Sequence, residues 1–310
     1  MKISKVTIIS VSYNHEKFIR QTLESFVSQR TNFPFEVFIA DDASTDKTTD
    51  IIKEFSINYP NIIKPTLREK NLGIYNNSIQ ILKQIKSQYV ALCDGDDYWT
   101  DPLKLQKQVD FLDSHPDYSI CFCYTKAFFE DKSHPDYIIP DPKIKNLSSI
   151  DYMQTCSVMY RWRFNDKEKI EDFFTKDIYP PDYFLNFFHS QKGKIGFIPE
   201  IMAAYRICSS GIYQYQLINN NYNFYLNFCE KLINSYQIII DKHNASKIYY
   251  TCRQACQLRK LLFACIKLKE YKKLKLVIIK YLKLKPILLI LSLFSIIEIP
   301  IRKILKIHDK

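Results

Sequence analysis

Residues 6–14 read VTIISVSYN and, with the segment that follows them to residue 27, decide the fold. The first part is a short apolar run rich in β-branched side chains, which favours a buried strand. The segment behind it has apolar side chains at helical spacing: Phe18, Ile19, Leu23, Phe26 and Val27. A strand, a turn and a helix in this order predict the start of an α/β domain.

The strand and helix pattern then repeats. A second apolar run covers residues 36–40, and helical spacing resumes with Ile51 and Phe55. Ser44 or Thr45 is placed to cap this second helix. Strands that alternate with helices of this length predict a parallel sheet with helices on both faces.

A third unit follows the second. Residues 74–85 show helical spacing and residues 89–93 form another apolar run. Asp101 and Pro102 are placed to open the next helix as its cap and first-turn proline. Ligands of such sheets bind beyond the carboxyl ends of the strands, so the residues after each run are candidates for a binding site.

Aspartates follow two of the predicted strands. Asp41 and Asp42 come directly after residues 36–40. Three more come after residues 89–93: Asp94, Asp96 and Asp97. Because the carboxyl ends of parallel strands face one crevice, we expect both clusters to face it. Aspartates after strands are also common as helix caps and turn formers, and that interpretation stays open for either cluster.

An Asp-x-Asp pair at a strand end presents hard oxygen ligands with room for water. Mg²⁺ and Mn²⁺ prefer carboxylate and phosphate oxygens, so the pair suits a metal that bridges to a nucleotide's diphosphate and neutralises charge on the leaving group. The sequence contains no Walker loop and no G-x-G-x-x-G motif, which argues against a P-loop NTPase and a dinucleotide dehydrogenase.

Four short motifs occur in a fixed order: SVSYN at 10–14, ADDASTD at 40–46, KNLGIYNN at 70–77 and LCDGDDYW at 92–99. Their joint order and spacing resemble those of the family 2 glycosyltransferases, over roughly residues 4–212. The resemblance implies an α/β fold of the GT-A type, which is a Rossmann-like fold of nucleotide-diphospho-sugar transferases, here followed by a basic helical appendage.

The resemblance also implies a nucleotide pocket. Tyr13 and Asp42 would lie against the base, with the main chain near Val11 beside it. One of three further residues would border the same pocket: Arg68, Lys70 or Asn71.

By the same resemblance, the acidic motif would bind the rest of the donor. Asp94 would lie near the ribose or sugar and Asp96 would bind the metal, Mn²⁺ or Mg²⁺, while Asp97 would support them or cap a helix. Arg206 sits where related enzymes have a loop that closes over the donor diphosphate. Its charge could stabilise the departing nucleotide, and a salt-bridged structural role is the alternative.

Inverting sugar transfer needs a carboxylate, from a segment other than the metal site, to take the proton of the acceptor hydroxyl. Residues 179–185, YPPDYFL, resemble the stretch that holds the family's catalytic aspartate, so Asp182 is the expected general base. Pro181 stands where the family more often has Glu or Gly, and Asp177 is the nearest rival. A purely structural role for Asp182, as a helix cap, is the other alternative.

The C-terminal region differs in composition from the rest. Residues 242–310 hold 17 Lys and Arg against three acidic residues, whereas the first 241 residues hold 27 against 30. We therefore expect a GT-A catalytic domain over 1–215, with a nucleotide-binding half at 1–100 and an acceptor-binding half at 101–215, and a helical basic region over 216–310. One helix there would bury a stripe of residues: Ile248, Cys252, Leu258, Leu262, Cys265 and Ile266.

Residues 286–301 form a run of sixteen residues in which Glu298 is the only charge. A spanning helix needs about 20 apolar residues, so this run is too short to cross a bilayer. It could be a core helix of a helical subdomain, a dimerisation surface, or a segment lying in the bilayer interface with flanking lysines on anionic headgroups. We favour the last interpretation.

Composition narrows the class and the compartment. With 46% hydrophobic and 25% charged residues, the chain is globular rather than disordered or collagen-like. Its nine cysteines lack zinc-site spacing, and the first apolar run is too short for a secretion signal, which favours a reducing, cytoplasmic compartment.

The expected function is inverting, metal-dependent transfer of a sugar from a nucleotide-diphosphate sugar, with UDP favoured, to a hydroxyl of a surface glycan or lipid-linked saccharide. The protein would be peripheral on the inner face of the cytoplasmic membrane. Two alternatives are a nucleotidyltransferase of similar α/β architecture and a non-catalytic basic module that binds membrane or nucleic acid. A nucleic-acid partner is not expected, because the tail has few Arg and a long apolar run.

Overall fold

The computed structural model describes residues 4–144, 147, 150–164, 169–170, 176–209, 211, 216, 221–243 and 246–294. The chain divides into two compact units, a larger one of Met1–Lys176 and Pro181–Cys208 and a smaller one of Asp177–Pro180 and Ser209–Lys310. The expected boundary after residue 215 falls in a stretch that is mostly outside the described residues.

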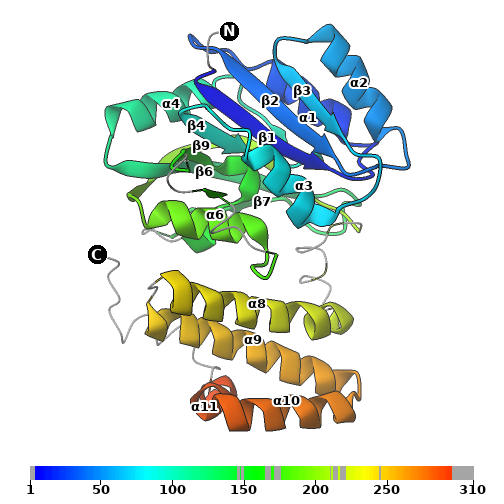
Figure 1. Cartoon of the computed structure of the whole chain (residues 1–310), viewed down its shortest axis with the longest axis vertical. Helices are drawn as coiled ribbons and strands as arrows, with labels where there is room; N and C mark the ends of the chain where they lie inside the picture. The colour runs from blue at the N-terminus through cyan, green and yellow to red at the C-terminus, as the bar shows by residue number, and fades with distance from the viewer. Residues whose placement is uncertain are drawn as a thin grey trace. The chain divides into compact units, whose positions relative to one another are not determined.

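A mixed sheet forms the centre of the larger unit (Figure 1). Within the described residues it has nine strands in the order β3-β2-β1-β4-β8-β6-β9-β5, with β7 paired to β6. The strands are β1 (Val6–Ser12), β2 (Phe35–Asp41), β3 (Ile63–Leu67), β4 (Tyr89–Leu92), β5 (Tyr98–Trp99), β6 (Tyr118–Phe129), β7 (Tyr137–Ile139), β8 (Met159–Arg161) and β9 (Lys194–Ile207).

The predicted parallel sheet is confirmed for β1 to β4, which pair in parallel. Beyond β4 the sheet is mixed, because β8 runs antiparallel to both β4 and β6, whereas β6 and β9 pair in parallel. β8 has three residues and follows a 3₁₀ turn, Thr155–Ser157. So short a strand is too brief for its sequence pattern to reveal the direction in which it runs.

Helices connect the strands of the larger unit: α1 (Ile19–Val27), α2 (Thr48–Asn58), α3 (Gly73–Leu82), α4 (Lys104–Ser114) and α6 (Pro181–Ser190). Figure 1 shows α3 lying across β1 and β2, on which it packs. The helices expected after the first three apolar runs are all present.

Two helix caps differ from the expected ones. Ser44 and Thr45 do not cap α2, because their hydroxyls bond to residues at the ends of β1 and β2 instead. The helix begins at Thr48, whose amide donates to the Asp46 carboxylate at 2.9 Å. Asp101 caps the turn before α4 rather than the helix itself. Its carboxylate accepts a hydrogen bond from the Leu103 amide at 2.8 Å.

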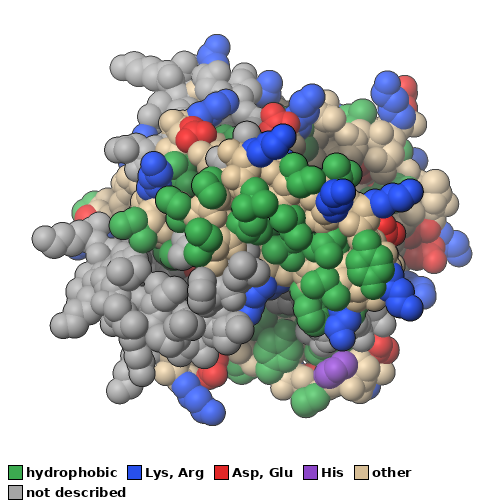
Figure 2. Space-filling view, turned by 90° about the horizontal axis from the view of Figure 1, so that it is seen from below, with side chains coloured by type: hydrophobic (Ala, Val, Ile, Leu, Met, Phe, Trp, Pro, Cys, Tyr) green, Lys and Arg blue, Asp and Glu red, His purple; other side chains and the backbone are tan. Residues whose placement is uncertain are grey.

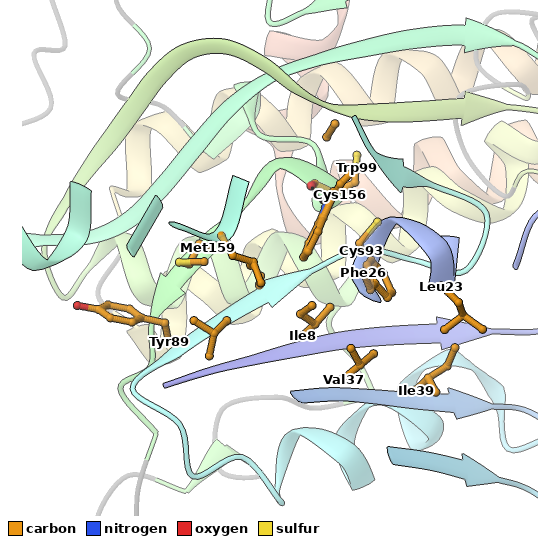
Figure 3. Close-up of a cluster of buried hydrophobic side chains, with 14 of the residues drawn as sticks. Ile8, Leu23, Phe26, Val37, Ile39, Tyr89, Cys93, Trp99, Cys156 and Met159 are labelled. Atoms are coloured by element: carbon orange, nitrogen blue, oxygen red, sulfur yellow. Dashed lines mark hydrogen bonds between the residues drawn. The ribbon is translucent and has the colours of Figure 1, made fainter. Parts of the chain in front are cut away.

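The core of the larger unit lies between the sheet and α1. Ile8, Val37 and Ile39 of adjacent parallel strands converge with Leu23 and Phe26 of α1 (Figure 3), and all five side chains are fully buried. Burying a side chain of this size stabilises the fold by about 1.5–3 kcal/mol. The helical spacing seen in the sequence therefore marks the face of α1 that holds it on the sheet.

The strand register places the loop after β4 beside the end of β1. Leu92, the last residue of β4, pairs with Ile9 in the middle of β1. The chain then continues along β1, because the amides of Cys93 and Gly95 donate to the carbonyls of Ile9 and Val11 at 3.1 and 2.9 Å. The acidic loop therefore lies at the carboxyl end of β1.

The smaller unit is helical, as expected for the C-terminal region. Its helices are α8 (Tyr222–His243), α9 (Lys247–Lys267), α10 (Tyr271–Leu284) and α11 (Pro286–Phe294). The expected stripe on α9 is confirmed at Leu258, Leu262 and Cys265, which are buried. It is wrong at Ile248 and Ile266, which are exposed, because the buried face turns toward the helices packed beside α9.

The apolar run 286–301 is only partly described. Its first part is α11, where Leu288 and Leu289 are buried in the core of the smaller unit. The core-helix interpretation therefore holds for these residues, and residues 295–301 lie outside the described residues. Among the helices that the structure describes, none is both long and apolar enough to cross a membrane.

His189 gives the larger unit a pH-dependent stability. Its ring is fully buried, its Nδ1 lies 2.9 Å from the Leu185 carbonyl, and burial lowers its pKa to about 3. In the unfolded chain the imidazole takes up a proton near pH 6.5, so stability is full above that value and is lost as pH falls toward the folded pKa. The loss is about 1.4 kcal/mol per pH unit.

A His189→Gln variant removes this titration. Urea unfolding at pH 7, 5.5 and 4.5 should show a wild-type free energy of unfolding that falls toward acid more steeply than that of the variant. Parallel pH dependences for the two proteins would show that His189 is protonated in the fold.

Candidate active site

The loop of residues 94–97 packs closely on the end of β1 because Gly95 has no side chain. A Cβ atom there would approach three atoms: His15 Nδ1 at 2.9 Å, Ser12 Oγ at 3.0 Å and Ile19 Cδ1 at 3.1 Å. Thr22 of α1 holds the same loop by donating its hydroxyl to the Asp97 carbonyl at 2.6 Å. The central residue of the Asp-Gly-Asp sequence thus allows the two aspartates to reach the strand ends.

The two aspartates at the end of β2 hold the neighbouring loops. Both carboxylate oxygens of Asp42 accept main-chain hydrogen bonds, from the amides of Leu72 at 2.7 Å and Gly73 at 2.9 Å. Asp41 is buried and accepts from two hydroxyls, that of Ser44 in the loop after β2 and that of Thr49 in α2. Asp42 therefore fixes the start of α3, and its expected contact with a nucleotide base stays a prediction.

Two other expected members of the nucleotide pocket lie where β1 ends. Tyr13 follows the strand directly and its side chain is exposed. The carbonyl of Val11 accepts from the Gly95 amide, so the main chain at this position links the first motif to the acidic loop.

The three candidates that follow β3 have different surroundings. Arg68 donates its Nε to Asn77 Oδ1 of α3 at 3.0 Å, and its Nη2 is buried without a partner among the described residues. Lys70 is exposed, and Asn71 accepts from the Gly73 amide at 3.0 Å. Of the three, Arg68 is the side chain with an unsatisfied donor.

The acidic loop and the expected base share one electrostatic environment. Burial raises the pKa of Asp94 well above its ordinary value, and the charges of Asp96 and Asp182 raise it further. Burial and then the charge of Asp96 raise the pKa of Asp97 as well. The charge of Asp182, about ninety residues downstream in the sequence, thus acts on the first aspartate of the Asp-x-Asp motif.

Asp182 lies in the first turn of α6. Its Oδ2 accepts a hydrogen bond from the Thr155 hydroxyl at 2.8 Å. Burial raises the pKa of Asp182, while the Thr155 hydroxyl and the amides of Asp182 and Tyr183 act in the opposite direction. These amide contacts fit the helix-cap alternative too, so the position alone does not separate the two roles.

Arg206 in β9 clamps the acidic loop. Its amide donates to Asp97 Oδ1 and its Nε donates to the Asp96 carbonyl, both at 2.9 Å. The rest of the guanidinium is paired with Glu130 and with Gln21 Oε1 and is almost fully buried. These bonds support the structural alternative for Arg206 rather than the expected contact with the donor diphosphate.

His15 is a further candidate, which the sequence patterns did not indicate. The structure places His15 Nε2 at 4.0 Å from Asp96 Oδ2, and its Nδ1 is buried without a partner among the described residues. Two residues 81 positions apart in the sequence meet because the acidic loop crosses the end of β1. No local signal could have revealed this pair.

The donor set fits a divalent cation that is shared with a substrate. Among the described residues, no group of three or more His, Cys, Asp or Glu side chains surrounds a common metal position. The Asp96 side chain is partly exposed, and the pKa of Asp94 beside it is raised by burial and then by the charges of Asp96 and Asp182. Mg²⁺ in such sites is bound by one or two carboxylates, with phosphate oxygens and waters as the remaining ligands.

The fold is an α/β domain of the GT-A type. Of its four parallel strands, β4 leads into the acidic loop, which bonds to the end of β1. Residues 7–207 match the family model described as glycosyl transferase family 2, and the chain belongs to this family.

Comparisons with individual proteins agree with this assignment. The uncharacterized protein Rv1520 of Mycobacterium tuberculosis is 41% identical over 213 residues, which cover 67% of this chain and 60% of that protein. WfaP of Escherichia coli, a UDP-Glc:alpha-D-GlcNAc-diphosphoundecaprenol beta-1,3-glucosyltransferase, is 34% identical over 125 residues, or 40% of this chain and 47% of WfaP. The chain thus spans less than two thirds of the length of these relatives.

A solved structure shows the same fold. The mannosyltransferase PcManGT from Pyrobaculum calidifontis, in complex with GDP-Man and Mn²⁺, superposes with a TM-score of 0.57 at 13% identity, over 99% of this chain and 89% of that one. The expected GT-A fold is therefore confirmed.

The Arg206 clamp predicts unequal costs for two arginine substitutions. Arg206→Met keeps the apolar contact with neighbouring rings but removes every guanidinium bond to the acidic loop and to its buried surroundings. We expect it to lower the free energy of unfolding by about 1–3 kcal/mol. The matched control is Arg20→Met, which breaks an exposed ion pair with Glu54 and should cost about 1 kcal/mol or less. Urea denaturation measures both, and equal losses would contradict the clamp.

Proposed function

We propose that this chain is an inverting, metal-dependent glycosyltransferase that moves a sugar from a nucleotide-diphosphate sugar to a hydroxyl group, with Asp182 as the general base. The observation that carries the proposal is the position of Asp182, in the first turn of α6 and bonded by the Thr155 hydroxyl, from which its charge acts on Asp94. The base and the donor-binding carboxylates would come from different segments of the chain, as an attack opposite the leaving group requires.

The residues would divide the reaction between them. Asp182, oriented by the Thr155 hydroxyl, accepts the proton of the acceptor hydroxyl as the new bond to the anomeric carbon forms. The bond from that carbon to the diphosphate breaks, and the nucleotide diphosphate leaves with the electron pair. A divalent ion held by Asp96 would neutralise charge on this leaving group.

The other site residues would bind and position. Tyr13 and Asp42 would lie against the base, Arg68 would offer its unsatisfied donor to the nucleotide, and Asp94 would contact the ribose or sugar. Arg206 would act as a positioning residue, because it fixes the main chain of the metal-binding aspartate.

The nature of donor and acceptor is supported by the relatives. WfaP is named for a UDP-glucose donor and an acceptor on diphosphoundecaprenol, and PcManGT was solved with GDP-Man and Mn²⁺. We propose a UDP-sugar donor, Mn²⁺ or Mg²⁺, and a surface glycan or lipid-linked saccharide as acceptor. A lipid-linked acceptor would place the enzyme on the inner face of the cytoplasmic membrane, in contact with anionic lipid.

A nucleotide-binding measurement tests the donor site separately from turnover. Thermal unfolding in Mn²⁺ with UDP should show stabilisation of the wild-type protein, of about 2.7 kcal/mol when free ligand is 100 times its dissociation constant. Asp96→Asn should abolish the part of the shift that depends on Mn²⁺, and chelation with EDTA should do the same for the wild type. Absence of any shift with UDP, GDP and dTDP alike would contradict the proposal.

The rate of nucleotide diphosphate release tests whether Asp182 is the general base. In a panel of nucleotide sugars with Mn²⁺, followed by release of the nucleotide diphosphate, Asp182→Asn should lower the rate by about 10²–10⁴-fold while nucleotide binding is retained. The matched control is Asp177→Asn, which changes the exposed rival aspartate of the smaller unit and should leave the rate unchanged. If Asp177→Asn removed activity and Asp182→Asn did not, the assignment would be reversed.

Measuring pyrophosphate exchange beside diphosphate release distinguishes a glycosyltransferase from a nucleotidyltransferase. A glycosyltransferase releases a nucleoside diphosphate from its donor, whereas a nucleotidyltransferase exchanges pyrophosphate with a nucleoside triphosphate. Labelled pyrophosphate incorporation in the absence of diphosphate release would favour the alternative.

A further inference from the structure

Two helices of the smaller unit carry apolar side chains on both sides. Val277 and Tyr281 of α10 and Leu288 of α11 are buried in the core of the unit. Other large apolar side chains of the same two helices are exposed: Leu276, Ile279, Leu282, Ile287 and Ile290. Leu276 and Ile287 are the most exposed of these, at 67% and 69%. An ordinary surface helix has one apolar face, so the second one needs an explanation.

The exposed side chains recur at helical spacing. Leu276, Ile279 and Leu282 follow one another at intervals of three residues, and Ile287 and Ile290 repeat that interval on α11. Residues three apart lie on the same side of a helix. Figure 2 shows hydrophobic side chains gathered in a band on this side of the smaller unit, with Lys and Arg around it. We call these five residues and the six lysines of α10 and the residue that follows it the α10–α11 face.

The charge of the α10–α11 face is of one sign. Residues 271–294 contain six lysines and no Asp or Glu. Lys272, Lys275 and Lys283 are exposed and have no hydrogen bond or ion pair to another described residue. The other three lysines bond within the smaller unit: Lys273 to the Leu226 carbonyl, Lys280 to Glu230 and Lys285 to Gln237.

We propose that the α10–α11 face docks on an anionic lipid bilayer. A helix that lies in the bilayer interface combines an apolar face with lysines whose long stems let the charge reach the headgroups. The face has both parts, and its lack of carboxylates removes the repulsion that anionic headgroups would otherwise meet. A second copy of this chain would bring like charges together, since both faces would carry the same lysines.

The proposal changes the interpretation of the apolar run 286–301. That run was expected to lie in the interface as a whole, yet Leu288 and Leu289 are part of the core. The docking surface includes α10 instead, and only the exposed side of α11 contributes to it. The inference deepens the proposed function, because a lipid-linked acceptor would be presented at the same bilayer.

Vesicle flotation with the full chain tests the proposal without requiring turnover. Vesicles of phosphatidylcholine with 30% phosphatidylglycerol should carry the protein upward, and pure phosphatidylcholine vesicles should not. Binding should weaken as salt is raised, because a Debye length of about 8 Å at physiological ionic strength shrinks further.

Two variants test the lysines and the apolar side chains of the α10–α11 face separately. Changing Lys272, Lys275 and Lys283 to Gln should lower the vesicle partition coefficient about a hundredfold, at about fivefold for each lysine near an anionic surface. Changing Leu276, Ile279 and Leu282 to Ser should lower it at least tenfold. The matched control is Ile57→Ser, which alters an equally exposed isoleucine (76%) of α2 in the larger unit and should leave binding unchanged.

Each outcome of the vesicle experiment has a different meaning for the proposed docking. Equal binding by all variants, or binding to neutral and anionic vesicles alike, would overturn the proposal. A wild-type dimer in light scattering that the serine variant dissociates would show that a second copy covers the face. Nucleotide diphosphate release without vesicles should be the same in wild type and variants, so a failure of docking and a failure of the proposed reaction are told apart.

Discussion

The amide of Gly95 donates to the carbonyl of Val11, and this contact sets how close the acidic loop comes to the end of β1. Because no Cβ intervenes, the loop turns over β1 and exposes Asp96 beside His15 while Asp97 points back into the protein. Arg206 then fixes the loop from β9, on the far part of the sheet. A short apolar strand, one glycine and one arginine thus define the candidate metal position.

The same arrangement creates an electrostatic cost. Burial and mutual repulsion raise the pKa of Asp94 and Asp97, and burial raises that of Asp182. Like charges that are held together in this way lower the stability of the fold, and such clusters are typical of functional sites. The carboxylate of Asp182, which would take the proton, accepts a hydrogen bond from the Thr155 hydroxyl, and this bond orients it.

The sequence predicted the first half of the sheet well because β1, β2 and β4 are continuous apolar runs with amphipathic helices behind them. It did not predict the mixed half, where β8 has three residues and β5 has two. The site divides in the same way. Residues that follow long strands were found from local patterns and a family resemblance, whereas His15 beside Asp96 and the Arg206 clamp depend on contacts between distant segments.

The two units distribute their apolar and charged side chains differently. In the larger unit, apolar residues are buried and charges gather at the strand ends, where they can bind a small polar ligand. In α10 and α11, leucine and isoleucine lie on both the buried and the exposed sides, with lysine between them. A helix pattern read from sequence cannot tell these two sides apart, because both repeat every three or four residues. Only the packing of Val277, Tyr281 and Leu288 shows which side is core and leaves the other for a partner.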